Sequence, residues 1–131
     1  MVPESGGFDP AEVFSLLGSW KGATFFCAPS MVPRLINAPG LADADTSNLK
    51  TIVYGGAPMY VADVIQSLDL FGSKLVQVYG QGEAPMNISF LPRHFYAERD
   101  HPRYAERIGS NGIARTDLEP RVVDDPALTH I

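Results

Sequence analysis

Apolar residues first recur at helical spacing near the start of the chain. Their spacing matches the 3.6-residue period of a helix that packs one face on a core. The residues of this apolar stripe are Val13, Leu16, Leu17 and Trp20. Asp9, followed by a proline and then by Glu12, matches a capping box at a helix start. The pattern predicts a helix that begins at Asp9 and ends near Gly22.

Three short apolar runs follow, each typical of a strand. They are "ATFFCAP" (residues 23–29), "LKTIVY" (49–54) and "KLVQVY" (74–79). The first run is nearly all apolar, which is typical of a strand covered on both faces in a parallel sheet. Its single cysteine, Cys27, is predicted to be a small core residue.

Helical segments separate these strands. Ser30 is predicted to cap a helix that runs to about Asn37, and Gly72 to end another helix, whose apolar stripe is Val61, Val64, Ile65 and Leu68. Short connections between alternating helices and strands favour right-handed parallel crossovers. We therefore predict an α/β fold, a three-layer unit with a parallel β-sheet (a βαβαβ core) and a C-terminal β-strand extension.

Parallel crossovers bring the turns after the strands to one edge of the sheet. Residues 28–30, 55–58 and 80–83 are then neighbours at the carboxyl edge, where open α/β sheets bind ligands. Glycines there allow close approach of a ligand, and Glu83 supplies a hard oxygen ligand. The alternative is that these are plain structural turns and that Tyr54 and Tyr79 only pack.

Composition narrows the class of protein. The chain has 131 residues, 45% hydrophobic and 19% charged, which suits one globular domain. Its net charge of −5 argues against nucleic-acid binding. One cysteine excludes an internal disulfide, no apolar run reaches membrane-spanning length, and "MVPESGGFDP" does not resemble a secretory signal. A cytoplasmic location is expected.

Five stretches, in this order and spacing, carry a family resemblance. They are "GGFDPAEVFSLL", "FFCAPSMVPRLI", "LKTIVYGGAPM", "LVQVYGQGEAPMNIS" and "RIGSNGIARTDLEPRVVDD". Together they resemble the central part of the N-terminal domain of adenylate-forming acyl-CoA synthetases, the AMP-dependent synthetase and ligase family. The resemblance covers essentially the whole chain and is specific in combination. It implies use of ATP and magnesium, with CoA as co-substrate and AMP as product.

The resemblance also assigns residues. In such enzymes the GGAP turn lies along adenine and the motif tyrosine stacks on its other face, with the motif acid helping to bind magnesium. The implied nucleotide-binding residues are Gly55, Gly56, Ala57, Pro58, Tyr79, Gly80, Gln81, Gly82 and Glu83, with Glu83 also the magnesium ligand. Gln81 is implied to lie beside both the nucleotide and the acyl tunnel.

One motif position departs from the family pattern. Gly82 replaces the family's phosphate-contacting threonine, which leaves Asn87 or Ser89 as nearby polar groups. The family's lysine-ending phosphate loop, its ribose-binding aspartate and its C-terminal lysine have no counterpart among the motifs of this sequence. We therefore expect a fragment of an ATP-dependent acyl-CoA synthetase for a carboxylic acid, a fatty acid by preference, that is inactive alone.

The expected organisation has three parts. Residues 1–92 form an α/β subdomain fragment with the adenine-binding turns, residues 93–107 a connector, and residues 108–131 the strand-forming tail of an incomplete β subdomain. From about Ile108 the tail is expected to pack apart and to allow self-association. The alternative function is a non-catalytic, stand-alone nucleotide-binding or interaction module. A hydrolase is disfavoured because no G-x-S-x-G elbow is present.

Overall fold

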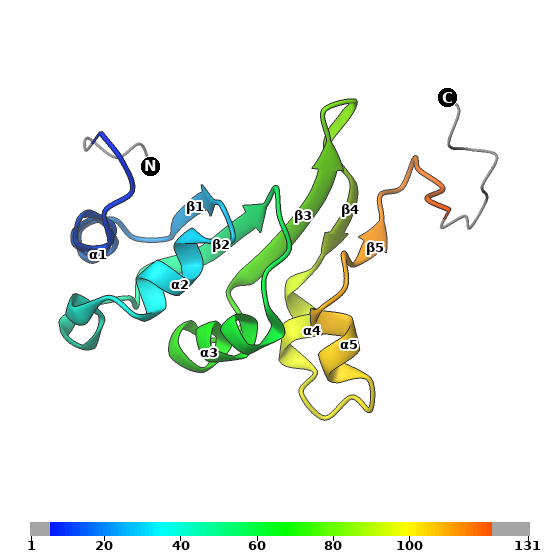
Figure 1. Cartoon of the computed structure of the whole chain (residues 1–131). Helices are drawn as coiled ribbons and strands as arrows, with labels where there is room; N and C mark the ends of the chain where they lie inside the picture. Colours follow the sequence, from blue (N-terminus) through cyan, green and yellow to red (C-terminus); the bar gives the residue numbers. More distant parts are fainter. Residues whose placement is uncertain (1–5, 122–131) are drawn as a thin grey trace.

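A five-stranded sheet with the strand order β1-β2-β3-β4-β5 forms the centre of the fold (Figure 1). The computed structural model describes residues 6–121. The strands are β1 (Ala23–Cys27), β2 (Leu49–Gly55), β3 (Leu75–Gln81), β4 (Ala84–Leu91) and β5 (Ile113–Ala114). The helices are α1 (Pro10–Ser19), α2 (Met31–Ile36), the 3-10 helix η1 (Pro39–Asp43), α3 (Val61–Phe71), α4 (Arg93–Ala97) and α5 (Tyr104–Ile108).

The first three strands are parallel, as predicted. β1 pairs with β2 and β2 with β3, and α2 and α3 make the crossovers. The α/β class and the βαβαβ core are thus confirmed. None of the described helices is long and apolar enough to cross a membrane.

Local sequence signals explain most helix ends. The Asp9 carboxylate accepts a hydrogen bond from the Ala11 backbone N–H at 3.0 Å, which caps α1. Gly72 ends α3 with a φ of 74°, a left-handed value that suits glycine. The predicted Ser30 cap is wrong, because Ser30 itself has helical backbone angles and its side chain makes no cap hydrogen bond.

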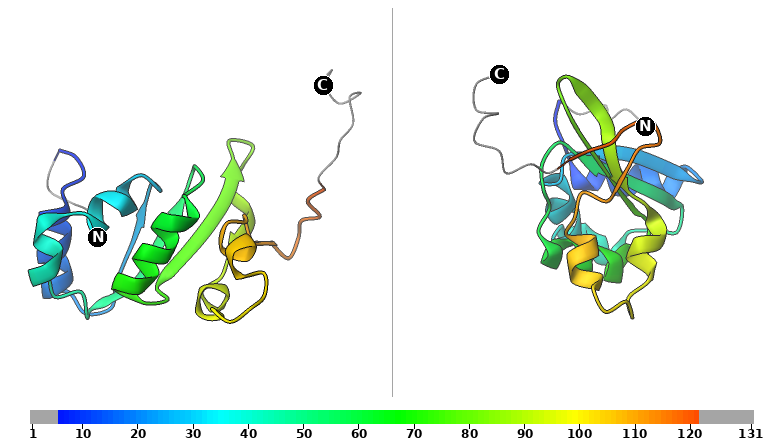
Figure 2. Two further views of the ribbon diagram at one scale, coloured as in Figure 1. Left: turned by 60° about the horizontal axis from the view of Figure 1, so that its bottom comes forward. Right: turned by 90° about the vertical axis from the view of Figure 1, so that its right-hand side faces the viewer.

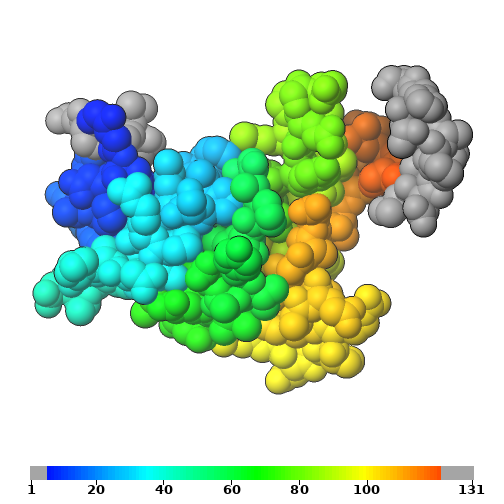
Figure 3. All heavy atoms as spheres, viewed as in Figure 1, coloured from blue at the N-terminus to red at the C-terminus, as the bar shows by residue number. Residues whose placement is uncertain are grey.

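The end of the third strand differs from the prediction. β3 continues to Gln81, and a two-residue turn leads directly into β4, which runs antiparallel to β3. The sheet is therefore mixed rather than parallel throughout. Tyr79 pairs with Ser89 and Gln81 with Ala84, so one residue of β3 lies opposite four residues of β4. This bulge belongs to a hairpin that projects beyond its neighbours (Figure 3).

Burial alternates along the strands. On one face the side chains enter the core, with α2 and α3 side by side over them (Figure 2). On the other face Phe26 is 51% exposed. Its sheet neighbours there are part-exposed, and together they form what we call the open face: Phe26, Val53, Val76, Val78 and Phe90. The open face is not free of contacts among the described residues, because the guanidinium carbon of Arg115 lies 5.9 Å from the centre of the Phe90 ring.

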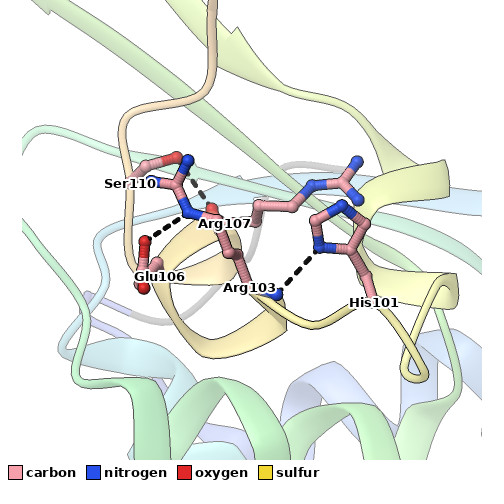
Figure 4. Close-up of polar contacts among 5 residues, drawn as sticks. All are labelled: His101, Arg103, Glu106, Arg107 and Ser110. Atoms are coloured by element: carbon pink, nitrogen blue, oxygen red, sulfur yellow. Dashed lines mark hydrogen bonds and ion pairs between the residues drawn. The ribbon is translucent and has the colours of Figure 1, made fainter.

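The segment of residues 93–107 forms α4 and α5 and packs on the core through Tyr96. Short polar contacts hold α5 in place (Figure 4). The Arg103 backbone N–H donates to His101 Nδ1 at 3.0 Å, Arg103 pairs with Glu106 at 2.6 Å, and the Ser110 hydroxyl donates to the Arg107 carbonyl at 2.7 Å. These contacts direct the chain from α5 back toward the sheet.

The chain after α5 joins the central sheet. Ile108 is 1% exposed, and β5 pairs with β4 through Ile113 and Phe90. The expectation that the tail packs apart from about Ile108 is therefore wrong for the described part. Residues 122–131 of the predicted tail lie outside the described residues. The division into subdomain, connector and tail remains a prediction.

Candidate functional site

The GGAP turn (residues 55–58) leaves β2 at the carboxyl edge of the sheet. Gly55 is buried, and a Cβ at this position would overlap the carbonyl of Val78 on β3. Gly56 has a φ of 96°, which side chains disfavour. The first glycine is therefore needed for close strand packing and the second for the turn. Ala57 and Pro58 are consequently exposed at the edge.

The GGAP turn separates two cavities. The β1–β2 cavity, of about 330 Å³, lies between this turn and residues 28–30. The β2–β3 cavity, of about 270 Å³, is lined by Gly56, Ala57, Pro58, Gln77, Val78, Tyr79, Gly80 and Asn111. The two glycine turns were predicted to lie side by side at one edge of the sheet. This is confirmed for residues 56–58 and residues 79–80, which line the same cavity.

The last part of the second motif lies elsewhere. Gln81, Gly82 and Glu83 are exposed around the hairpin turn and do not line the β2–β3 cavity. Gln81 Nε2 donates to the Tyr79 hydroxyl at 3.1 Å, which links the turn to the cavity wall. The structure thus brings together five of the nine predicted nucleotide-binding residues around one cavity. Gly55 packs against Val78 and does not line this cavity.

Gly80 shapes the wall beside Tyr79. A Cβ at Gly80 would overlap the backbone of Met86 and the carbonyl of Ala84, because the bulge of β4 crosses directly over it. Met86 has a φ of 55° in this bulge, unusual for a residue with a side chain. Gly82, in contrast, has open space around its position. Of these two glycines, only Gly80 is therefore sterically required.

Two polar residues of the β2–β3 cavity, Gln77 and Asn111, were not predicted as site residues from the sequence. Gln77 is only 6% exposed, and its Nε2 donates to Asn111 Oδ1 at 3.1 Å. Gln77 was predicted only as part of a strand, although a glutamine within an apolar run was a signal. Asn111 lies in the quoted "GSNG" stretch, which was used only for the resemblance.

The polar alternatives to the missing threonine differ in their surroundings. Ser89 is buried, and its hydroxyl donates to the Asn111 carbonyl at 2.7 Å, so this hydroxyl already has a partner. Asn87 is exposed on β4. Neither residue lines the β2–β3 cavity, so neither replaces the missing threonine hydroxyl there.

Charges are sparse at this edge. Asp63 lines the β1–β2 cavity, and the described lining of both cavities contains no lysine or arginine. Within residues 6–121, no three His, Cys, Asp or Glu side chains are grouped closely enough to hold a metal ion. The edge thus suits a flat, largely uncharged part of a ligand better than a polyphosphate.

Comparison with known proteins decides the family. The family model described as AMP-binding enzyme matches residues 1–129. The chain belongs to this family. The match confirms the resemblance drawn from the sequence motifs, and the curated relatives and structural neighbours are consistent with a fragment of the N-terminal domain.

Two curated relatives illustrate the match. The chain is 33% identical over 92 residues to the medium/long-chain-fatty-acid–CoA ligase FadD8 of Mycobacterium tuberculosis, covering 70% of this chain and 16% of that protein. It is also 33% identical over 106 residues to the feruloyl-CoA synthase of an Amycolatopsis species, covering 81% of this chain and 20% of that protein. The chain therefore spans a fifth or less of these two relatives.

Solved structures agree with the fold. An amide bond synthetase, the McbA K483A mutant from Marinactinospora thermotolerans, superposes with a TM-score of 0.65 at 26% identity. The match covers 82% of this chain and 20% of that one. The N-terminal domain of FACL13 from Mycobacterium tuberculosis superposes with a TM-score of 0.62 at 23% identity, over 82% of this chain and 25% of that one. The second likeness supports the fold alone.

Proposed function

We propose that this chain supplies the adenine wall and one side of the acyl pocket of an ATP-dependent acid–CoA ligase in the cytoplasm. Such an enzyme activates a carboxylic acid as acyl-AMP and transfers the acyl group to CoA. The supporting observation is the β2–β3 cavity, in which the GGAP turn faces Tyr79 and Gly80. Two curated relatives are named as fatty-acid–CoA ligases and another as a feruloyl-CoA synthase.

The β2–β3 cavity suits a purine base. Ala57 and Pro58 form one wall, Tyr79 offers an aromatic face, and Gln77 adds a polar group deeper in the cavity. Stacking of a base on an aromatic side chain contributes about 1–3 kcal/mol. Apolar walls with a few directed polar groups are typical of small-molecule sites. We therefore assign this cavity to adenine.

The open face suits the acyl group. Gly55 pairs with Val78, so this apolar surface begins directly at the GGAP turn. A hydrocarbon chain laid over Phe26, Val53 and Val78 would remove part-exposed apolar surface from water. A medium- or long-chain fatty acid is the proposed substrate, and an aromatic acid is the alternative to be compared in the assay.

Glu83 is the proposed magnesium ligand of the complete enzyme. Magnesium is usually held by one or two carboxylates together with phosphate oxygens and water. Glu83 is one exposed carboxylate in the hairpin turn after β3, and within the described residues no three carboxylate, His or Cys side chains are grouped closely enough to hold the ion. The residues fit magnesium only together with the nucleotide phosphates. When bound, the ion would offset the charge of the leaving pyrophosphate.

The same geometry predicts that the chain alone is inactive. Adenylation requires the α-phosphate, the carboxylate and a stabilising cation to be held together. The cavity lining contains no cationic side chain, and Gly82 lacks the motif hydroxyl. Each charge-assisted phosphate contact is worth about 1.5–3 kcal/mol, so losing several leaves weak nucleotide binding. ATP should bind with a dissociation constant of about 1 mM or weaker.

Two measurements on the purified chain test this function. Pyrophosphate exchange with fatty or aromatic acids should stay at background, whereas acid-dependent exchange abolished by Glu83→Ala would contradict the proposal. Adenosine at millimolar concentration should shift amide resonances of residues 56–58 and 77–80, and Tyr79→Ala should remove these shifts. Trp20→Ala is the control, because Trp20 is 64% exposed and lines neither cavity. Tight, acid-independent ATP binding would favour the stand-alone binding module.

A further inference from the structure

The backbone around Asn111 is held from two directions. The Ser110 hydroxyl donates to the Arg107 carbonyl at 2.7 Å and accepts from the Gly112 backbone N–H at 3.1 Å (Figure 4 shows the first contact). The Ser89 hydroxyl donates to the Asn111 carbonyl at 2.7 Å. The loop is thus attached to α5 on one side and to β4 on the other.

Gly112 brings this loop directly against β4. Its φ of 81° lies in the left-handed region, and a Cβ there would overlap the carbonyl of Phe90. Only glycine fits this contact. The backbone contacts of Ser110 and Gly112 therefore hold Asn111 beside the β2–β3 cavity independently of the contacts of its own side chain.

The side chains of Gln77 and Asn111 form a pair at the cavity wall. Gln77 Nε2 donates to Asn111 Oδ1 at 3.1 Å, and both residues line the β2–β3 cavity. Within the described residues, Gln77 Oε1 and Asn111 Nδ2 have no hydrogen-bond partner. If the nitrogen and oxygen positions of both carboxamides are exchanged, Asn111 donates to Gln77 instead. One amide nitrogen and one amide oxygen of the pair then still lack a partner. The pair thus offers both kinds of hydrogen bond.

We propose that Asn111 is a positioning residue that orients the Gln77 carboxamide, so that the pair distinguishes adenine from 6-oxopurines. The inference rests on the proposed adenine site. Adenine presents an amino donor beside a ring-nitrogen acceptor, and carboxamides recognise this combination. In hypoxanthine a carbonyl replaces the amino group, so the acceptor of the oriented pair would face another acceptor.

The orientation is measurable without any ligand. In the full 131-residue chain, the Gln77 side-chain amide protons should be resolved by NMR, exchange slowly with water and show contacts to Asn111. Asn111→Ala should remove these features, because a nearly buried amide loses its acceptor. Asn111→Asp keeps an acceptor and should preserve them. Rapid exchange of the Gln77 amide in the wild type would overturn the inference.

Base selectivity is the second test, by NMR titration with adenosine and inosine. We expect the wild type to bind adenosine about five-fold more tightly than inosine, as for one net hydrogen bond. Asn111→Ala should bring this ratio close to one, whereas Asn111→Asp should retain the preference. Asn37→Ala is the matched control, because Asn37 is exposed, donates to the Pro33 carbonyl and lies outside the β2–β3 cavity.

The outcomes separate the two proposals. An unchanged adenosine-to-inosine ratio in Asn111→Ala overturns the role of Asn111 and leaves the adenine site standing. Equal binding of adenosine and inosine by the wild type also overturns the role of Asn111 without affecting the proposed adenine site. If the wild type binds neither nucleoside at millimolar concentration, the proposed adenine wall fails, and the inference fails with it.

Discussion

The hydroxyl oxygens of Tyr54 and Tyr96 lie 2.8 Å apart in the core, although 42 positions separate the two residues in the chain. Both are almost fully buried, at 1% and 0% exposed. Tyr54 immediately precedes the GGAP turn on β2, and Tyr96 belongs to α4. This hydrogen bond therefore connects the helical segment after β4 to the strand that carries the candidate site.

Breaking this pair on one side should destabilise the protein. Tyr96→Phe leaves the Tyr54 hydroxyl buried without its partner, so the free energy of unfolding should fall by about 1–3 kcal/mol. The double variant Tyr54→Phe, Tyr96→Phe should cost less than the sum of the single variants, because neither hydroxyl is then orphaned. Urea denaturation followed by circular dichroism measures both. Tyr60→Phe, at an 82% exposed residue, should change nothing, and strictly additive losses would contradict the coupling.

Alkaline pH should also destabilise the fold. Burial raises the pKa of Tyr54 to about 12 and that of Cys27 to about 12, and burial raises the pKa of Tyr96 as well. Since the ordinary values are 10.0 for tyrosine and 9.0 for cysteine, the unfolded chain loses these protons first. Their contribution is fully present below pH 9 and falls as pH rises toward 12. The double phenylalanine variant should show a shallower decline in urea titrations, and an equally steep one would refute this account.

Two neighbouring glycines should respond in opposite ways to alanine. Gly80→Ala places a methyl group on the Met86 backbone, so it should lower the unfolding free energy by about 1–3 kcal/mol and disturb the wall beside Tyr79. Gly82→Ala meets no atom within 4 Å and should stay within about 0.5 kcal/mol of the wild type. Chemical denaturation of the two variants compares them directly. Similar losses at both positions would mean that the bulge is not packed as described.

Self-association of the chain remains a prediction, and the structure suggests a surface for it. β5 already pairs with β4, whereas the open face exposes apolar side chains, with Phe26 at 51%. We expect sedimentation velocity at high concentration to detect association, and Phe26→Lys to reduce it. Ile113→Lys, on β5, tests the earlier idea of association through the tail. A larger effect of Ile113→Lys would assign the contact to the tail instead.

Local patterns in the sequence were sufficient for the first half of the fold. The stripes of α1 and α3 and the apolar runs of β1, β2 and β3 repeat within single elements, so their periods report which side of each element packs on the core. The prediction was wrong for Trp20, which lies just after α1 and is 64% exposed, and for Ile65, which is 38% exposed. The Asp9 cap and the Gly72 helix end are equally local, since the partners lie within a few residues. The strand–turn–helix order then implied that residues 56–58 and 79–80 meet at one edge, as they do.

Tertiary structure alone decided the pairing of β4, the open face of the sheet and the two long-range contacts. Periodicity shows that a residue such as Phe26 is apolar but does not show what covers it. Contacts such as Gln77 with Asn111 and Tyr54 with Tyr96 join single residues 34 and 42 positions apart. A single polar side chain leaves no periodic mark in the sequence, so its partner is defined only when folding brings distant segments together.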